Sequence, residues 1–289
     1  MKFVTYKYKG AEHVGALTAD ESAVIPASEL GLKAESMLEL IDELAGKLPA
    51  VPEKAKALPL GDVKLEAPIP EPRQDIICLG LNYRDHAEEA TRADAVFDVQ
   101  RGDAVYFSKR LQHAVAPGDR IDGHFDICDS LDYEVELGVV IGRDAKNVKA
   151  AEAGEYIFGY TIINDVSARN LQTRHKQWYF GKSLDDFTPM GPCIISAETV
   201  GAMPELGIRC YVNGEKRQDS NTRMMIFDIP YIIEELSAGM TLKAGTIIAT
   251  GTPSGVALGM EPSVQKYLES GDVVRCEIDG IGVLENTIA

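Results

Sequence analysis

Residues 131–141 read Leu131-Asp132-Tyr133-Glu134-Val135-Glu136-Leu137-Gly138-Val139-Val140-Ile141. This largely apolar run predicts a β-strand, in which Glu134 and Glu136 share one face while Tyr133 and Val135 share the other. Two carboxylates about 7 Å apart on one face are costly to bury unless one is protonated or a cation lies between them. The pattern therefore favours a hard divalent metal ion, and the exposed polar face of a half-buried strand is the alternative.

A third carboxylate follows about thirty residues later. Residues 160–166 form another apolar run, with Asp165 near its end and a polar, helix-compatible segment behind it at 167–172. Three carboxylates with room for water and substrate suit Mg²⁺, with Mn²⁺ as the second choice. The chain offers no paired cysteines or histidines at zinc spacing. We predict that Glu134, Glu136 and Asp165 bind Mg²⁺.

These residues resemble the fumarylacetoacetate hydrolase family, whose metal site is built from Glu-x-Glu and a later Asp. The resemblance covers roughly residues 73–289, and the motifs occur in the family's order. It is carried by residues 82–89, 132–142, 159–172, 181–192, 212–215, 220–227 and 250–255. The resemblance implies a rolled, mixed β-sandwich that wraps around the metal site.

The chain divides near residue 72. Residues 1–60 show a small α+β pattern, and a proline-rich connector follows, so we predict an N-terminal domain at 1–72 and a metal-binding catalytic domain at 73–289. Short apolar runs beside turn-like pairs predict that the second domain is mostly β. Helices are expected around 85–91 and 229–237.

Composition narrows the function. The 289-residue chain is 45% hydrophobic, which is enough for a real core. Its net charge of -16 disfavours nucleic acid and anionic membranes as partners. An anionic substrate must therefore meet a local positive site. The five cysteines form no CxxC pair and are expected to be reduced. No signal segment or long apolar run is evident, which predicts a cytoplasmic protein.

His86 and Glu89 are candidates for activating water. In a helix they lie three residues apart, so the carboxylate can orient the imidazole. An ordinary surface pair has the same spacing, and Glu88 is a rival partner. The resemblance implies a catalytic His/Glu pair on a segment that folds over the metal. An acidic stretch at 94–103 replaces the family's shorter, proline-bearing connection, which leaves open whether residues 87–103 close as a lid.

Four further residues are candidates for holding the substrate. The resemblance places Lys182 near the ionising oxygen, where an ammonium group stabilises developing negative charge; a solvated loop lysine is the alternative. It implies that Arg169 and Gln172 anchor the distal part of a keto acid. Glycines at 250–255 would let backbone N–H groups and the Thr252 hydroxyl approach a carboxylate, although an ordinary loop looks similar.

Together these residues predict a Mg²⁺-dependent hydrolase that cleaves the C3–C4 bond of acylpyruvates or related 2,4-diketo acids. The products are pyruvate and a carboxylate. The same metal-enolate core serves oxaloacetate decarboxylation or tautomerisation, isomerisation of a 2-hydroxydienoate, and hydrolysis of a 2,4-diketo-3-deoxy sugar acid. A catalytically silent scaffold is the non-enzymatic alternative. The resemblance also implies a homodimer.

Overall fold

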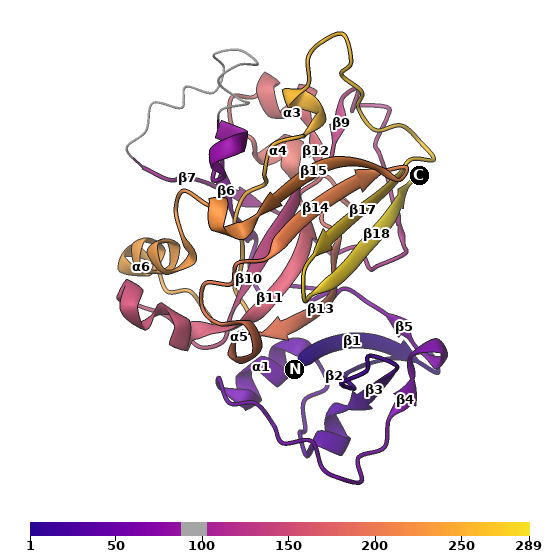
Figure 1. The fold of residues 1–289 in the computed structure, drawn as a ribbon, viewed down its shortest axis with the longest axis vertical. Helices are drawn as coiled ribbons and strands as arrows, with labels where there is room; N and C mark the ends of the chain where they lie inside the picture. The colour runs from indigo at the N-terminus through magenta and orange to yellow at the C-terminus, as the bar shows by residue number, and fades with distance from the viewer. Residues whose placement is uncertain (88–102) are drawn as a thin grey trace.

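The computed structural model describes residues 1–87 and 103–289. Strands dominate these residues and form mixed sheets in two layers, with the N-terminal strands gathered at one end of the molecule (Figure 1). The predicted mostly β fold is confirmed.

The N-terminal residues form a small antiparallel meander with one α-helix. Helix α1 begins after Ser36, whose hydroxyl accepts a hydrogen bond from the Glu39 backbone N–H at 3.3 Å, and it buries Leu40 and Ile41. The elements are β1 (Lys2–Tyr8), β2 (Ala11–Leu17), β3 (Ala23–Pro26), the 3-10 turn η1 (Ala27–Leu30), α1 (Met37–Leu44), β4 (Leu58–Pro59), η2 (Leu60–Asp62) and β5 (Lys64–Leu65).

This unit is joined to the rest of the chain through backbone pairing. Strand β1 pairs antiparallel with β13, with Phe3 opposite Ile194. The Phe3 ring also stacks on Phe158 with the centroids 5.2 Å apart. The division near residue 72 stays a prediction, but the two parts share one sheet.

The large sheet carries the strands around the carboxylates. Among the described residues its order is β4-β3-β2-β1-β13-β11-β10-β16-β6-β7, with β5 paired to β1. Leu137 of β10 lies opposite Ile162 of β11 in an antiparallel pair. The strands not yet bounded are β6 (Ile76–Gly80), β7 (Val105–Lys109), β10 (Val135–Ile141), β11 (Ile157–Asn164), β13 (Met190–Ser196) and β16 (Ile247–Ala249).

A second sheet packs over β10 and β11 (Figure 1). Its order is β15-β14-β17-β18-β8, and a short pair, β9 with β12, lies apart from both sheets. Leu137 and Val139 from one sheet share a buried cluster with Ile208 and Val274 from the other. The bounds are β8 (Arg120–Ile121), β9 (Leu131–Asp132), β12 (Ser167–Ala168), β14 (Gly207–Val212), β15 (Glu215–Asn221), β17 (Val273–Ile278) and β18 (Gly282–Ile288).

The helices are short. Helix α6 confirms the prediction for 229–237, and the Asp228 carboxylate caps it by accepting from the Tyr231 N–H at 2.8 Å. Residues 84–87 are helical, and the rest of the helix expected at 85–91 lies outside the described residues. None of the described helices is long and apolar enough to cross a membrane. The helical elements are η3 (Ala150–Tyr156), α3 (Arg169–Arg174), α4 (Tyr179–Lys182), α5 (Ala197–Val200), η4 (Thr222–Met224), α6 (Ile229–Gly239) and η5 (Ala257–Gly259).

The five cysteines are free and buried, as predicted. They lie in the apolar interior at Cys78, Cys128, Cys193, Cys210 and Cys276.

Close packing of β11 on β13 depends on Gly159. A Cβ at this position would collide with the Ile195 carbonyl oxygen and lie 2.7 Å from the Ile194 Cγ2. We expect Gly159→Ala to lower the free energy of unfolding by about 1–3 kcal/mol, since the two central strands must separate. Urea denaturation measures this. Gly239→Ala is the control, because no atom lies within 4 Å of its added Cβ; equal losses in both variants would contradict the packing argument.

Candidate active site

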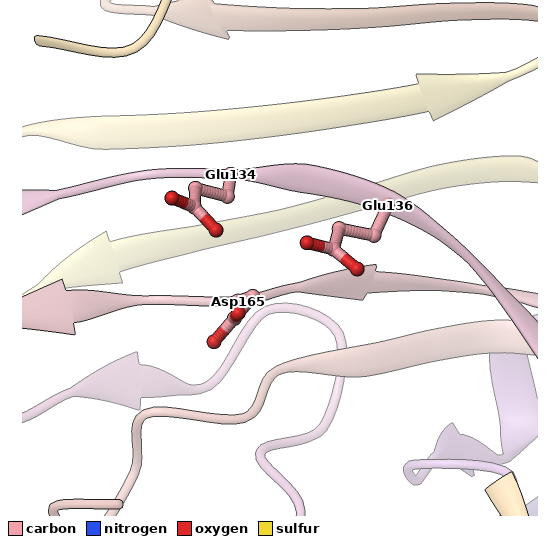
Figure 2. A group of neighbouring side chains, drawn as sticks. All are labelled: Glu134, Glu136 and Asp165. Carbon is pink, nitrogen blue, oxygen red and sulfur yellow. The ribbon is translucent and has the colours of Figure 1, made fainter. Parts of the chain in front are cut away.

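Three carboxylates meet where β10 and β11 run side by side. One oxygen from each of Glu134, Glu136 and Asp165 lies within 4.8 Å of the others, and Figure 2 shows the two glutamates projecting from one side of a strand toward Asp165. The backbone fixes this arrangement, because the Asp165 N–H donates to the Glu134 carbonyl at 2.8 Å. All three side chains are buried. The predicted cluster is therefore present.

The strand that carries the glutamates is interrupted. Strand β9 ends at Asp132 and β10 begins at Val135, so Tyr133 and Glu134 lie between two strands. The bend is held by the Asp132 carboxylate, which accepts hydrogen bonds from the backbone N–H groups of Tyr133 at 2.9 Å and Ala257 at 2.8 Å. Glu134 and Glu136 nevertheless keep the predicted common face (Figure 2).

Buried cations separate the carboxylates. The Lys182 ammonium group lies 2.6 Å from Glu134 Oε2 and 2.7 Å from Asp165 Oδ2. Arg169 pairs with Glu134 Oε1 through Nη2 at 2.6 Å and with Asp132 Oδ2 through Nε at 2.8 Å. Positive and negative side chains thus alternate through the site. The solvated-loop alternative for Lys182 is wrong, because its side chain is 2% exposed.

Helices α3 and α4 deliver these cations. Arg169 begins α3 and Lys182 ends α4. The two helices pack backbone to backbone at Gly181, where a Cβ would collide with the Gln172 nitrogen and lie 2.7 Å from the Ala168 carbonyl oxygen. A glycine is therefore needed just before Lys182 for the ammonium group to reach the carboxylates.

Lys109, at the end of β7, is a site residue that the sequence reasoning missed. Its side chain is completely buried, and its ammonium group forms an ion pair with Asp165 Oδ1 at 2.7 Å. It also donates to the carbonyl oxygens of Val166 at 3.0 Å and Lys182 at 2.5 Å. The sequence signal is weak, since a lysine that ends a short β-favouring run is usually exposed.

The cluster as a whole fits a divalent cation. With every group ionised, four buried carboxylates face three buried cations, leaving a net charge of about -1 that a dication would turn positive. The ligand atoms of the triad are all carboxylate oxygens, which hard cations prefer. The groups are Asp132, Glu134, Glu136 and Asp165 against Lys109, Arg169 and Lys182.

Charge also separates the two glutamates. Burial alone would raise the pKa of Glu134, but the positive charges of Lys182 and Arg169, with a smaller contribution from His86, lower it to about 2. The pKa of Glu136 is raised well above its usual range by burial and by the negative charges of Asp165 and Glu134. Of the two glutamates, Glu136 therefore holds a proton more readily.

Comparison with known proteins identifies the family. The family model described as "Fumarylacetoacetate (FAA) hydrolase C-terminal" matches residues 75–289. The chain belongs to the fumarylacetoacetate hydrolase family. The predicted family is thus confirmed over most of the chain, and the N-terminal meander lies outside the match.

Individual members of the family are also similar. The sequence is 47% identical over 229 residues to Oxaloacetate tautomerase YisK of Bacillus subtilis (strain 168), covering 79% of this chain and 74% of that protein. The structure matches Fumarylacetoacetate hydrolase (EaFAH) from psychrophilic Exiguobacterium antarcticum with a TM-score of 0.86, at 38% identity over 100% of this chain and 99% of that one. It also matches 2-hydroxyhepta-2,4-diene-1,7-dioate isomerase from Mycobacterium marinum with a TM-score of 0.76, at 31% identity over 100% and 98%. The named relatives thus include a hydrolase, a tautomerase and an isomerase.

His86 lies on an anchored turn next to the site of this family member. The adjacent Asp85 carboxylate accepts hydrogen bonds from Ser220 Oγ at 3.0 Å and Ser254 Oγ at 3.3 Å. The positive charge of His86 also makes a small contribution to the low pKa of Glu134. Glu89 and the rival Glu88 lie outside the described residues, as does most of the segment 87–103, for which closure as a lid was left open. The catalytic pair stays a prediction.

Arg169 and Gln172 reach the site but already bind protein groups. Arg169 Nη1 donates to Gln172 Oε1 at 3.0 Å. Because Nε and Nη2 pair with Asp132 and Glu134, each of the three guanidinium nitrogens has a protein partner. Their predicted contact with substrate stays a prediction.

The 250–255 loop contacts a carboxylate of the protein. The Gly251 N–H donates to Glu136 Oε2 at 2.8 Å. The Thr252 hydroxyl donates to the Val135 carbonyl at 2.9 Å and accepts from Gln218 Nε2 at 2.8 Å. The loop therefore positions Glu136, a predicted metal ligand, and the strand that carries it. The substrate-binding role of Thr252 stays a prediction.

The raised pKa of Glu136 predicts how stability depends on pH without metal. Above the ordinary value of 4.5, folded Glu136 still holds a proton that the unfolded chain has lost. The folded state then binds more protons, so the free energy of unfolding falls as the pH rises toward the folded pKa. We expect the melting temperature in EDTA to fall as the pH is raised above 4.5, and to fall less in Glu136→Gln. Identical slopes in the two proteins would contradict this assignment.

Proposed function

We propose that this protein is a metal-dependent enzyme that forms the enolate of a small 2-oxo acid, with oxaloacetate keto–enol tautomerisation as its activity. The observation that carries the proposal is the buried triad with the Lys182 ammonium group 2.6 Å from Glu134 and 2.7 Å from Asp165. Such a site is suited to stabilising negative charge on oxygen. The 47% identity to a protein named as an oxaloacetate tautomerase supports the same reaction.

A metal ion would be held by Glu134, Glu136 and Asp165. When bound, Mg²⁺ or Mn²⁺ supplies Lewis-acid stabilisation of the 2-oxo oxygen. The dication also makes the buried cluster positive, which attracts a dianionic substrate even though the chain carries a net charge of -16.

Lys182 and His86 have different roles in the proton transfer. Although burial lowers the pKa of Lys182, Asp165 and Glu134 raise it above its ordinary value, so Lys182 acts as a charged hydrogen-bond donor to the enolate oxygen. His86, on its anchored turn, is the candidate base. It removes a proton from C3 as the C3=C2 double bond forms, and the enolate oxygen then takes up a proton. No bond between carbon atoms breaks and no oxidant is required.

Hydrolysis of acylpyruvates is the second candidate. It is supported by the contribution of His86 to the low pKa of Glu134 and by the similarity to a structure named as a fumarylacetoacetate hydrolase. Water would add to C4, the C3–C4 bond would break, and its electron pair would form the enolate of pyruvate with release of a carboxylic acid. This route needs His86, and Glu89 as its partner, to activate water.

One assay separates these reactions. Enol absorbance is followed for oxaloacetate and acetylpyruvate with Mg²⁺ or EDTA, and pyruvate is measured at the end. Tautomerisation predicts Mg²⁺-dependent interconversion of oxaloacetate without pyruvate. Pyruvate from acetylpyruvate indicates the hydrolase, and pyruvate from oxaloacetate indicates a decarboxylase. No change with either compound would overturn the proposal and favour a sugar-acid hydrolase, a dienoate isomerase or a scaffold.

The assay needs a variant that changes charge away from the site. Asp144→Asn serves, because Asp144 forms an exposed ion pair with Lys243. It should keep wild-type rates.

Assembly as a homodimer stays a prediction, which size-exclusion chromatography with light scattering tests.

A further inference from the structure

Each carboxylate of the triad has one oxygen paired with a protein group other than Lys182, and the second oxygens of Glu134 and Asp165 accept hydrogen bonds from Lys182 at 2.6 and 2.7 Å. Arg169 pairs with Glu134 Oε1 at 2.6 Å. The Gly251 N–H donates to Glu136 Oε2 at 2.8 Å. Lys109 pairs with Asp165 Oδ1 at 2.7 Å. The three donors come from α3, from the loop after β16 and from β7, so they reach the cluster from different directions.

A metal ion would therefore bind the opposite oxygens, in place of the Lys182 ammonium group at Glu134 and Asp165. Mg²⁺ and Mn²⁺ suit single oxygens in a tight octahedral arrangement, at about 2.0–2.1 Å for Mg²⁺. Ca²⁺ takes about 6–8 oxygens at about 2.3–2.6 Å and often uses both oxygens of one carboxylate. Protein groups that occupy one oxygen of each carboxylate therefore disfavour binding of Ca²⁺.

We propose that Lys109 is a positioning residue that restricts Asp165 to one metal-facing oxygen and so makes the site select Mg²⁺ or Mn²⁺ over Ca²⁺. The inference rests on the proposed metal site and adds a determinant of its selectivity. Partners of a metal ligand that are not ligands themselves commonly affect affinity about 10–100-fold.

Lys109 is enclosed by the protein. Its side chain is completely buried, and the carbonyl oxygens of Val166 and Lys182 accept its remaining hydrogen bonds at 3.0 and 2.5 Å. With the ion pair to Asp165, the ammonium group has three protein partners. It therefore fixes the Asp165 carboxylate relative to the turn at Val166 and the end of α4.

Loss of Lys109 changes both charge and geometry, and the two effects can be separated. Removing a positive charge strengthens the attraction for any dication, by the same amount for Mg²⁺ and Ca²⁺ at one position. Freeing Asp165 Oδ1 favours the ion that accepts two oxygens from one carboxylate. The ratio of the two affinities therefore reports geometry alone.

Isothermal titration calorimetry of the full-length chain tests the proposal. Mg²⁺ and Ca²⁺ are titrated separately into wild type, Lys109→Met and the control Lys7→Met. Lys7 also pairs with a buried carboxylate, Glu66, at 3.0 Å, but on β1. We expect the affinity ratio to shift toward Ca²⁺ by about 10-fold or more in Lys109→Met and to be unchanged in Lys7→Met.

The outcomes distinguish two failures. A wild-type chain that binds neither ion overturns the metal site and with it the proposed function. A wild-type chain that binds Mg²⁺, together with a Lys109→Met variant of unchanged ratio, overturns only the role of Lys109. If Lys109→Met does not fold, Lys109→Ala is used, because its cavity can admit water to the carbonyls of Val166 and Lys182. The same shift toward Ca²⁺ is expected in that variant.

Discussion

Replacing Glu136 with glutamine is expected to abolish Mg²⁺-dependent turnover while leaving the metal-free protein at least as stable as wild type. Glutamine resembles a protonated glutamate in size and shape, and burial, Asp165 and Glu134 already favour the protonated form of Glu136. Its amide oxygen can still accept the hydrogen bond from Gly251 that Glu136 Oε2 accepts at 2.8 Å. The fold should therefore tolerate the change.

Catalysis should not tolerate it. One of three charged ligands is lost, so the site no longer holds a dication that stabilises the enolate. We expect kcat/KM to fall by roughly a thousand-fold. We also expect the rise in melting temperature on adding Mg²⁺, which follows from binding to the folded state, to disappear. Activity and thermal shift are measured together, with and without EDTA.

Two comparisons make this result specific. Asp165→Asn removes another predicted ligand, but it leaves Lys109 and Lys182, now 2.7 Å from a neutral amide, without their carboxylate. That variant should therefore lose stability as well as activity. Asp144→Asn, in an exposed ion pair, should lose neither. Full turnover by Glu136→Gln in EDTA would show that the reaction needs no metal at this site.

The triad could be predicted because short-range rules govern it. Alternation along a strand places Glu134 and Glu136 on one face, and the break after Asp132 leaves that relation intact. Asp165 was predicted from its place near the end of the next apolar run, and the resemblance, which implies Glu-x-Glu and a later Asp, supported that prediction. The pairing of Val135 with Asn164 then brings the three acids together.

The cations behind the triad could not be predicted in the same way. Lys109 is more than fifty residues from Asp165 in the chain, and the interaction depends on where β7 lies relative to the turn after β11. A lysine in that sequence context is normally solvated, so local pattern argues against its burial. Arg169 was identified from the resemblance, yet its contacts with Asp132 and Glu134 depend on the packing of α3. The positions of Lys109 and Arg169 in the site therefore depend on tertiary contacts.

Lys182→Met is expected to separate metal binding from catalysis. The Lys182 ammonium group lies 2.6 Å from Glu134 Oε2 and 2.7 Å from Asp165 Oδ2, the oxygens not held by Arg169 and Lys109. It therefore competes with a metal ion for the same atoms. Its removal also makes the cluster more negative. Both effects act in the same direction, so the affinity for Mg²⁺ should stay the same or rise.

Turnover should nevertheless fall, because the donor that stabilises the enolate oxygen is gone. Loss of a donor of this kind typically lowers kcat by about 10²–10³-fold. The measurement pairs kcat at saturating Mg²⁺ with the Mg²⁺ affinity from calorimetry, using Lys243→Met as a surface control. If kcat and Mg²⁺ affinity both fell in Lys182→Met, Lys182 would act by holding the carboxylates for the metal. A fall in kcat with undiminished affinity would place the ammonium group in the chemistry itself.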